Sequence, residues 1–498
     1  MTRILIRTGK RPGQPVGPEA SIGYRKHGVF AMNVGNGYYW DSVFRWVSVP
    51  GVEVVPDSLL SAHPEQGKRY YDAINAEFDQ YVFTLTNSFR PTHAAGLHRW
   101  AEMIDKLTIP VIGVGGGVQL NWNEGLEPGD ETDRGTKHFM KSLLNHSASV
   151  SVRGEITGAY LKRLGFGDEH VRVTGCPSLY LYTPDYEVKP KGPLTSDSKV
   201  GITIAVRDYG FSAFANRAYE QYPNLMYIGQ TMGDIVTFVW GKDRLVAEKP
   251  DIPVHLGHPM VESNKTRMFL DPRVWTDFLK EYDFMLGTRI HGCVAALVGG
   301  TPATLISMDQ RTHELGLFHD IPTIRRPDMK DSDTVATVFE QSDWTAFNKG
   351  LRPRFEFFCR FFEENGVAHI GEPGNENPAF DEEQLAAELP PPIEPILHHG
   401  KLDPEALKSR VAWLRLGGVP EDTLAEVSNP DAEDPRAVLV RLNELRGTLN
   451  ETVMCEENGI FVPEFGIIQP LKNPRALSVY RRIRRFGGRI LRRMGLLK

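Results

Sequence analysis

Short apolar runs alternate with helical patterns in this chain, and that alternation constrains its fold more than any other feature. In the first part of the chain the apolar runs predict buried strands, and apolar side chains at helical spacing predict helices between them. The expected order is strand 81–85, helix 94–107, strand 110–114, helices 137–149 and 155–164, and strand 171–173. A strand–helix–strand alternation predicts a parallel sheet covered by helices on both faces.

The same alternation begins again after residues 183–193, a polar and proline-rich stretch that is typical of a linker. The second series is strand 200–206, helix 211–222, strand 225–228, helix 272–281, strand 284–286, helix 291–298 and strand 303–306. The sequence therefore predicts two Rossmann-like α/β domains, at residues 1–190 and 198–365. Two such domains are expected to face each other across a cleft and to hold their ligand there, near the carboxyl ends of the strands.

The C-terminal third has a different character. Residues 366–395 are expected to be a linker, and residues 396–470 carry a charged helical pattern that predicts an appendage of two or three short helices. Residues 471–498 form a basic amphipathic tail. Within it, residues 475–498 place apolar side chains at helical spacing among arginines, which suits an anionic membrane surface. A disordered basic tail is the alternative.

Composition and charge narrow the class of protein. The 498 residues are 41% hydrophobic and 24% charged, as in globular proteins, and no run approaches the ~20 apolar residues of a membrane span. The net charge of the chain is −6. Residues 472–498 carry ten Lys and Arg and no acidic residue, so the rest of the chain has a net charge of −6 − 10 = −16. An acidic body argues against a nucleic-acid-binding protein. The N-terminus lacks a signal-peptide pattern, and four scattered cysteines fit a reducing cytoplasm, so we expect a cytoplasmic protein, with peripheral contact to the inner face of the membrane left open.

The strongest chemical motif is residues 287–291, Gly-Thr-Arg-Ile-His, which opens a predicted helix directly after a strand. Such a junction presents free backbone N–H groups and the positive end of a helix to an anion. Arg289 adds a forked cationic donor that suits phosphate or carboxylate, and His291 can exchange protons near neutral pH. The alternative is that Arg289 pairs with a structural carboxylate and His291 caps the helix or packs in the core.

Three further arginines, Arg153, Arg207 and Arg311, stand at or near the ends of predicted strands. A single arginine is more often part of a surface salt bridge than a ligand. Four arginines at strand ends in two facing domains are harder to explain that way, because cleft ligands bind at strand ends. We therefore expect these residues to bind an anionic substrate.

Two glycine-containing turns are weaker candidates. The glycines Gly115, Gly116 and Gly117 follow a predicted strand, and glycine allows a close backbone approach to a ligand. A tight turn without a ligand is an equal alternative. Asn33 and Asn36 flank a second turn, for which an ordinary β-turn is the usual explanation.

Other chemistries find less support. The histidines of residues 93–146 lack metal-ligand spacing, no metal site is expected, and no G-x-S-x-G nucleophile motif is present. Cys176 and Cys293 are expected to be small core residues, although Cys293 lies two residues after His291 and a thiol role there stays open.

At these motifs the chain resembles the polysaccharide pyruvyl transferase family. Residues 284–307 are similar to the family's G-x-R-x-H helix followed by a small-residue turn, a proline and a buried strand, and residues 309–317 resemble its next segment, with Arg311 where lysine is common. Three shorter pieces, at 150–155, 112–117 and 33–36, resemble its S-x-R segment, glycine turn and N-x-G-[DN] loop. The likeness covers about residues 28–325. Cys176 stands where the family often has aspartate, and 380–498 has no counterpart.

The resemblance implies a GT-B-like pair of domains and phosphoenolpyruvate as donor, with no cofactor. It implies transfer of a pyruvyl group to a sugar of a polysaccharide or lipid-linked saccharide, which forms a ketal and releases phosphate. His291 and Arg289 would then be catalytic, and the remaining candidates would bind substrate. The alternative for His291 is that it only binds the donor phosphate. Two other functions stay open, a GT-B-like glycosyltransferase that uses a nucleotide sugar and a non-catalytic sugar-binding protein. A homo-oligomer is also left open.

Overall fold

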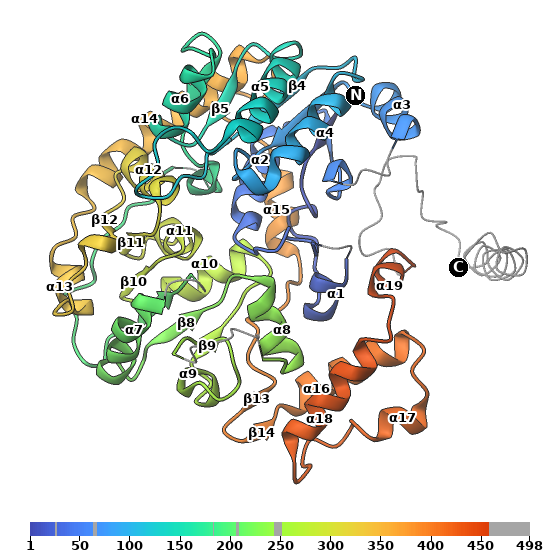
Figure 1. Ribbon diagram of the computed structural model, residues 1–498, viewed down its shortest axis with the longest axis vertical. Coiled ribbons are helices and arrows are strands. Elements are labelled where there is room, and N and C mark those ends of the chain that lie inside the picture. The colour runs from blue at the N-terminus through green and yellow to red at the C-terminus, as the bar shows by residue number, and fades with distance from the viewer. Residues whose placement is uncertain (25–26, 63–66, 183, 206–208, 244–250, 458–498) are drawn as a thin grey trace, which may run out of the picture.

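The computed structural model describes residues 1–24, 27–62, 67–182, 184–205, 209–243 and 251–457. Figure 1 shows two α/β domains, with the N-terminal strands and helices at the top and the second domain below and to the left, and a separate group of helices at the C-terminal end. The expected fold class, two parallel-sheet α/β domains with a helical appendage, is confirmed. The predicted tail at 471–498 lies outside the described residues.

The first domain is built on a parallel sheet in the order β2-β1-β3-β4. The parallel pair β5-β6 continues it through a bridge between Gly116 and Val152. Its strands are β1 Thr2–Ile6, β2 Val52–Pro56, β3 Gln80–Thr84, β4 Val111–Val114, β5 Val150–Val152 and β6 Val171–Val173. Its helices are α1 Pro18–Gly23, α2 Asn36–Val47, α3 Gly67–Glu77, α4 Ala94–Ile104, α5 Asp130–Leu144 and α6 Glu155–Arg163, with 3-10 turns at Leu60–Ala62, Pro91–His93 and Pro177–Tyr180.

Alternation of side chains along these strands divides the core into two layers. On β1, Leu5 packs into one apolar cluster and its neighbours Ile4 and Ile6 pack into the other. Successive side chains of a strand point to opposite faces, so both faces of this sheet are covered. Burying each such side chain contributes roughly 1.5–3 kcal/mol.

The second domain has a six-stranded parallel sheet in the order β12-β11-β10-β7-β8-β9. Counted from β7, this is the 3-2-1-4-5-6 order of a Rossmann fold, and the strand order reverses between β7 and β10. Its strands are β7 Val200–Thr203, β8 Met226–Ile228, β9 Thr266–Arg267, β10 Phe284–Gly287, β11 Ala303–Ser307 and β12 Thr323–Arg325. Its helices are α7 Tyr209–Gln221, α8 Met232–Trp240, α9 Pro259–Glu262, α10 Pro272–Lys280, α11 Ile290–Val298, α12 Gln310–His319, α13 Val335–Glu340 and α14 Thr345–Glu364, with a 3-10 turn at Arg326–Asp328.

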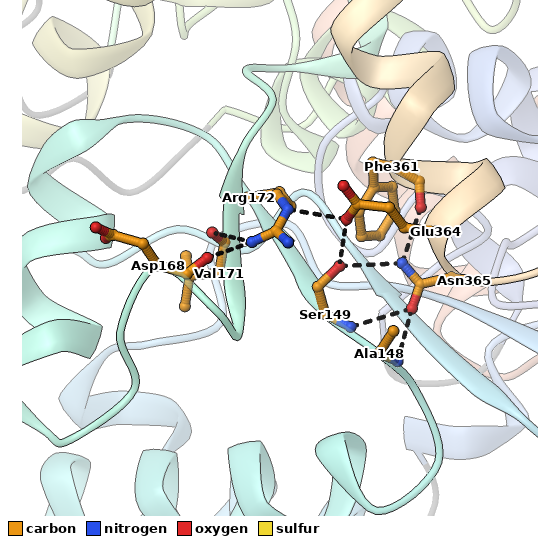
Figure 2. Close-up of polar contacts among 8 residues, drawn as sticks. All are labelled: Ala148, Ser149, Asp168, Val171, Arg172, Phe361, Glu364 and Asn365. Carbon is orange, nitrogen blue, oxygen red and sulfur yellow. Dashed lines mark hydrogen bonds and ion pairs between the residues drawn. The ribbon is translucent and has the colours of Figure 1, made fainter.

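The long helix α14 ends against the first domain, although its sequence follows the second. Figure 2 shows Glu364 and Asn365 at its C-terminal end beside Ser149 and Arg172. The Asn365 Oδ1 accepts from the backbone nitrogen of Ser149 at 3.2 Å, and Arg172 Nε donates to Glu364 at 2.8 Å. Farther back on α14, the ring of Phe355 lies 4.4 Å from that of Trp46. The helix therefore holds the two domains together.

The interval expected to be a linker, residues 366–395, contains the helix α15, Pro378–Ala386. The sequence pattern missed it because Asn377 and Pro378, which look like loop residues, are the N-cap and first residue of the helix: the Asn377 side chain accepts from the backbone nitrogen of Phe380. A salt bridge between Arg45 and Asp381 (2.6 Å) fixes α15 to the first domain.

The helical appendage follows a small hairpin of β13 Leu397–His398 and β14 Lys401–Leu402. It consists of α16 Pro404–Leu416, α17 Glu421–Ala425, α18 Pro435–Arg446 and α19 Glu451–Glu457. A buried ion pair between Arg410 and Glu19 joins α16 to α1. In the part of the chain that the structure describes, no helix combines the length and apolar character needed to cross a membrane.

Candidate functional site

The motif at 287–291 lies where the strand order of the second sheet reverses. Gly287 ends β10 with φ of +147°, and a Cβ at this position would come within 2.0 Å of the backbone oxygen of Thr203 on β7. Only glycine fits there. The next residue is fixed to the same strand end, because Thr288 donates from its backbone nitrogen to Thr203 at 2.9 Å and accepts from the backbone of Ala205 through its hydroxyl at 2.7 Å. The strand ends therefore place Arg289 as the N-cap of α11 and His291 in its first turn.

His291 is 6% exposed, and its Nε2 has no hydrogen-bond partner among the described residues. The loop of the first domain closes over it, since a Cβ at Gly35 would lie 2.6 Å from the His291 Nδ1. Burial, together with three nearby guanidinium groups, lowers the pKa of His291 to about 3. Those groups belong to Arg153, Arg311 and Arg289. The imidazole is therefore neutral at pH 7 and is surrounded by cations from both domains.

Arg153 follows β5 and reaches the same imidazole from the first domain. It is 3% exposed, and its Nε and Nη2 have no hydrogen-bond partner among the residues the structure describes. Its guanidinium lies 5.1 Å from the ring centroid of Tyr39, and a cation–π contact of this kind holds the group in place. Unpaired N–H donors on a buried cation are costly, and an anionic ligand would satisfy them.

The glycine turn supports Arg153 from behind. Gly115 has φ of +65°, and Gly116 accepts from the Arg153 backbone nitrogen at 2.9 Å while its own nitrogen donates to Ser151. A Cβ at Gly117 would lie 3.4 Å from the Arg153 Cδ. None of the three glycines is among the residues that line the pocket described below. Their visible role is to bring β4 against β5 and so position Arg153.

Arg311, in the first turn of α12, is partly balanced by Asp309 at 3.4 Å. Asp309 is the N-cap of this helix and accepts from the Thr312 nitrogen at 2.8 Å. The Nε of Arg311 has no partner among the described residues, so part of its donor capacity stays available.

These side chains line one pocket of about 970 Å³ between the domains. Six of the predicted site residues are found in it: Asn33, Asn36, Arg153, Arg289, His291 and Arg311. Arg207 lies outside the described residues. The structure thus brings together three of the four predicted arginines, Arg153 from the first domain and Arg289 and Arg311 from the second.

The two asparagines brace the loop over His291. Asn33 Oδ1 accepts from the Gly35 nitrogen and Asn36 Nδ2 donates to the Phe30 oxygen, both at 2.9 Å. Asn36 is also the first residue of α2. The turn at residues 33–36 is therefore more than an ordinary β-turn, because it holds Gly35 against the imidazole of His291.

Sequence reasoning missed several residues of the pocket. Arg7, Arg90, Arg99 and His93 line it from the first domain. Arg7 directly follows β1, and the strand order of the first sheet reverses between β1 and β3. Ligands bind at such a reversal, so predicting β1 from the sequence would have indicated Arg7 as a site residue. Among the lining residues six are arginines and one, Asp309, is a carboxylate. The pocket is therefore strongly cationic in an acidic protein.

The structure bears on metal chemistry and on thiol chemistry. No group of three or more His, Cys, Asp or Glu able to hold a metal occurs among the described residues. Cys293 is fully buried in α11, and burial raises the pKa of its thiol to about 12. A protonated, enclosed thiol is a poor nucleophile, which removes the thiol role left open above.

Fold and pocket together define a two-domain α/β protein with a strongly cationic pocket between its domains. The sequence model of one family, polysaccharide pyruvyl transferase, matches residues 33–310, which is more than half of the chain. The chain belongs to the polysaccharide pyruvyl transferase family, and the resemblance inferred from its motifs is confirmed.

No match to a curated protein sequence was found. Similar solved structures include UDP-N-acetylglucosamine 2-epimerase from Rickettsia bellii, at 14% identity and a TM-score of 0.37, covering 73% of this chain and 97% of that one. The enzyme of the same type from Neisseria meningitidis, bound to UDP-GlcNAc, has 10% identity and a TM-score of 0.33, covering 77% and 100%. The glycosyltransferase SnogD from Streptomyces nogalater has 12% identity and a TM-score of 0.27, covering 72% and 96%.

Proposed function

We propose that this protein transfers the pyruvyl group of phosphoenolpyruvate to a saccharide, forming a cyclic ketal and releasing phosphate. One observation carries the proposal: Arg153 of the first domain and Arg289 and Arg311 of the second converge on the neutral imidazole of His291. Membership of the pyruvyl transferase family supports the same reaction class.

The charge of the donor fits this convergence. Phosphoenolpyruvate carries a carboxylate and a phosphate on three carbons, so it needs several cationic donors within a small volume. Arg153 offers two buried nitrogens without partners among the described residues, and Arg311 offers one. Each charge-assisted hydrogen bond to such a ligand is worth ~1.5–3 kcal/mol.

Proton transfer in the proposed reaction balances within donor and acceptor. A proton added to the donor methylene makes it a methyl group and leaves an oxocarbenium-like centre at C2. One sugar hydroxyl attacks C2 and its proton returns to the group that protonated the methylene. A second hydroxyl then displaces phosphate and gives its proton to the departing phosphate or to solvent. We assign delivery of the methylene proton to His291, whose pKa is lowered first by burial and further by the three arginines. The negative charge of the donor offsets the arginines and raises the proton affinity of the imidazole.

The proposal is tested with two variants in calorimetric binding and turnover assays. Arg153→Gln is expected to weaken phosphoenolpyruvate binding ~10–100-fold, because it removes charge-assisted bonds. His291→Gln is expected to lower turnover ~10²–10⁴-fold with donor affinity retained. Arg134→Gln, an exposed arginine paired with Glu131, is the matched control. Weakened donor binding without a turnover defect in His291→Gln would refute the proton-transfer role, and unaltered donor affinity in Arg153→Gln would refute the donor site.

A nucleotide-sugar glycosyltransferase is the second candidate, because a pocket of about 970 Å³ with six lining arginines also has room for a diphosphate ligand. Thermal shift separates the two functions, since a ligand stabilises the protein that binds it. Stabilisation by UDP-glucose and none by phosphoenolpyruvate would favour glycosyl transfer. Mass analysis of candidate polysaccharides after incubation with phosphoenolpyruvate identifies the ketal product directly.

We also propose that the sequence 475–498 brings the enzyme to an anionic membrane surface where lipid-linked acceptors reside. The support is its sequence, in which arginines and apolar residues recur at helical spacing. Deletion of 475–498 is expected to abolish cosedimentation with anionic liposomes at low salt and to leave donor binding unchanged. Full retention of the truncated protein on the liposomes would contradict the proposal.

A further inference from the structure

A second group of basic residues faces the donor-binding arginines from the first domain. Arg7 follows β1, Arg90 precedes the 3-10 turn Pro91–His93 and His93 ends it, and Arg99 lies on α4. All four line the interdomain pocket, and we call them the basic wall. The reaction proposed above makes no use of them.

Arg7 is the fixed member of the basic wall. It is 7% exposed, donates from Nε to the Ser61 hydroxyl at 3.1 Å and from Nη1 to the Thr84 oxygen at 3.0 Å, and lies 4.5 Å from the Trp100 ring. The buried carboxyl of Asp57 interacts electrostatically with Arg7, and four neutral groups also donate hydrogen bonds to it. Those donors are the backbone nitrogens of Thr8 and Leu59 and the hydroxyls of Ser61 and Tyr81.

Arg90 and Arg99 have no ion pair among the described residues. Arg90 is half-buried, with an Nε that lacks a hydrogen-bond partner in the described part of the chain, and Arg99 is exposed at the rim. Burial lowers the pKa of Arg90, and repulsion from Arg311 lowers it further. Arg90 and Arg311 therefore lie close together, so the basic wall adjoins the donor-binding arginines.

His93 marks the centre of the basic wall. Its ring packs 4.5 Å from that of Trp100, and its Nε2 has no hydrogen-bond partner among the described residues. Burial lowers its pKa to about 3, with further contributions from the other three members of the wall and from His27. All three guanidinium groups of the wall disfavour protonation of His93, and its neutral imidazole can still donate or accept a hydrogen bond.

The pocket therefore contains more positive charge than the donor requires. The donor carries two anionic groups, and Arg153, Arg289 and Arg311 suffice for them. Its volume of about 970 Å³ lies at the upper end of small-molecule sites, ~300–1,000 Å³, so a three-carbon donor leaves most of it for the acceptor. A neutral saccharide gains little from clustered guanidinium groups, whereas a phosphate is their natural ligand.

We infer that the acceptor is a phosphorylated saccharide, whose phosphate or diphosphate ester binds the basic wall while its sugar hydroxyls face the donor. Amide groups suited to sugar hydroxyls line the same pocket: Asn87 Oδ1 and Gln230 Oε1 have no hydrogen-bond partner among the described residues. This inference rests on the proposed function for its donor, but the phosphate site stands on the geometry of the wall.

Calorimetric titration in the presence of phosphoenolpyruvate tests the inference. The probes are glucose 1-phosphate, galactose 1-phosphate and N-acetylglucosamine 1-phosphate, each against its free sugar. At least one phosphate is expected to bind 10-fold or more tightly than its sugar, with affinity that falls as salt rises. Arg90→Gln and Arg99→Gln are each expected to weaken this binding ~10-fold or more, and Arg134→Gln is expected to leave it unchanged.

Further probes separate the sources of the phosphate. Tighter binding of UDP-glucose or of farnesyl diphosphate, with the same loss in Arg90→Gln and Arg99→Gln, supports the inference and assigns a nucleotide or a polyprenyl carrier. Equal binding of free sugars and their phosphates overturns it, as does unchanged phosphosugar affinity in both arginine variants. Tighter binding of glucuronic acid than of the sugar phosphates would mean that the basic wall binds a carboxylate. Binding of inorganic phosphate but of no sugar phosphate would mean that the wall binds the phosphate product. Either result overturns the inference.

Failure of this inference is distinguishable from failure of the proposed function. Phosphoenolpyruvate binding without phosphosugar binding removes only the phosphorylated acceptor. If the protein binds the phosphosugar but not phosphoenolpyruvate, the basic wall is a phosphate site and the proposed pyruvyl transfer is contradicted. Arg153→Gln provides the internal comparison, because it is expected to weaken donor binding far more than phosphosugar binding.

Discussion

The carboxylate of Glu314, on α12 of the second domain, accepts two hydrogen bonds from Thr157 on α6 of the first. The backbone nitrogen of Thr157 donates at 2.9 Å and its hydroxyl at 2.7 Å. Glu314 is 2% exposed and packs against Gly154, where a Cβ would lie 2.7 Å from the Glu314 Cγ. Because Gly154 follows Arg153, this contact ties the position of Arg153 to the relative position of the two domains.

Glu314→Ala is expected to destabilise the protein by ~1–3 kcal/mol, because both Thr157 donors lose their buried partner. It is also expected to weaken phosphoenolpyruvate binding, since Arg153 loses its support. Denaturant unfolding and calorimetry measure the two effects. Leu317→Ala, on the exposed face of the same helix, is the control and is expected to change stability by less than ~0.5 kcal/mol. A Glu314→Ala protein with unchanged donor affinity would show that the contact is structural only.

Gly35→Ala is expected to abolish transfer, since the added Cβ would lie 2.6 Å from the His291 Nδ1 and must displace the imidazole or the loop. Gly37→Ala, two residues on and inside α2, meets nothing closer than the Pro272 Cγ at 3.4 Å, and it should fold and turn over normally. Steady-state kinetics of the pair provides the measurement. Equal activities would mean that the loop does not constrain His291.

Stability is expected to fall as the pH drops below about 6.5, because the pKa of His291 is lowered to about 3 in the folded protein. Between these values the unfolded chain binds a proton that the folded protein does not, so acid favours unfolding. For this one group the loss at pH 5 is about 2 kcal/mol relative to pH 7. Urea unfolding of the wild type and His291→Gln at both pH values tests this, and the variant should lose correspondingly less stability. Parallel losses in the two proteins would contradict the assignment.

Donor binding is expected to be accompanied by proton uptake, because the negative charge of phosphoenolpyruvate raises the pKa of His291 from its low value of about 3. Calorimetry at one pH in buffers of different ionisation enthalpy counts the protons taken up. The wild type should take up more than His291→Gln, and identical counts would exclude His291 as the group that is protonated.

Lys10 and Asp271 form a buried ion pair across the domains, with Nζ 3.3 Å from Oδ2 and with side chains 1% and 6% exposed. Asp41 adds a second carboxyl, and burial raises its pKa to about 7. Lys10→Met is expected to cost ~3–5 kcal/mol because it leaves buried carboxylates uncompensated, and Lys10→Met with Asp271→Asn should recover part of that loss. A double-mutant cycle by denaturant unfolding measures the coupling. Strict additivity of the two changes would show that the pair contributes nothing.

The local pattern around the strand ends allowed part of the site to be predicted. Arg153, Arg289 and Arg311 were recognised because each stands where an apolar run gives way to a turn or helix, and that transition is visible in a few residues of sequence. The glycine turn was recognised as well, but the structure shows it behind Arg153 and outside the pocket lining. Sequence alone does not distinguish a glycine that meets a ligand from one that meets a neighbouring strand.

The remaining site residues could not be predicted in the same way. Arg90, His93 and Arg99 lie on a turn and a helix that look like solvated surface, and they reach the pocket only because β3 lies beside β1 in the sheet. Similarly, the sequence predicts α14 as the last helix of the second domain. Only the contacts of its C-terminal end with Ser149 and Arg172 show that this end packs against the first domain.

The two α/β units, the strand–helix junction at 287–291 and the family could be predicted from the sequence alone, because each depends on residues that are neighbours in the chain. Only the tertiary structure shows which cations share a pocket, that burial keeps His291 neutral, and that the basic wall lines the same pocket as Arg153, Arg289 and Arg311. Those properties depend on burial and on distances between residues far apart in sequence. Electrostatic energies in a poorly solvated pocket change steeply with both.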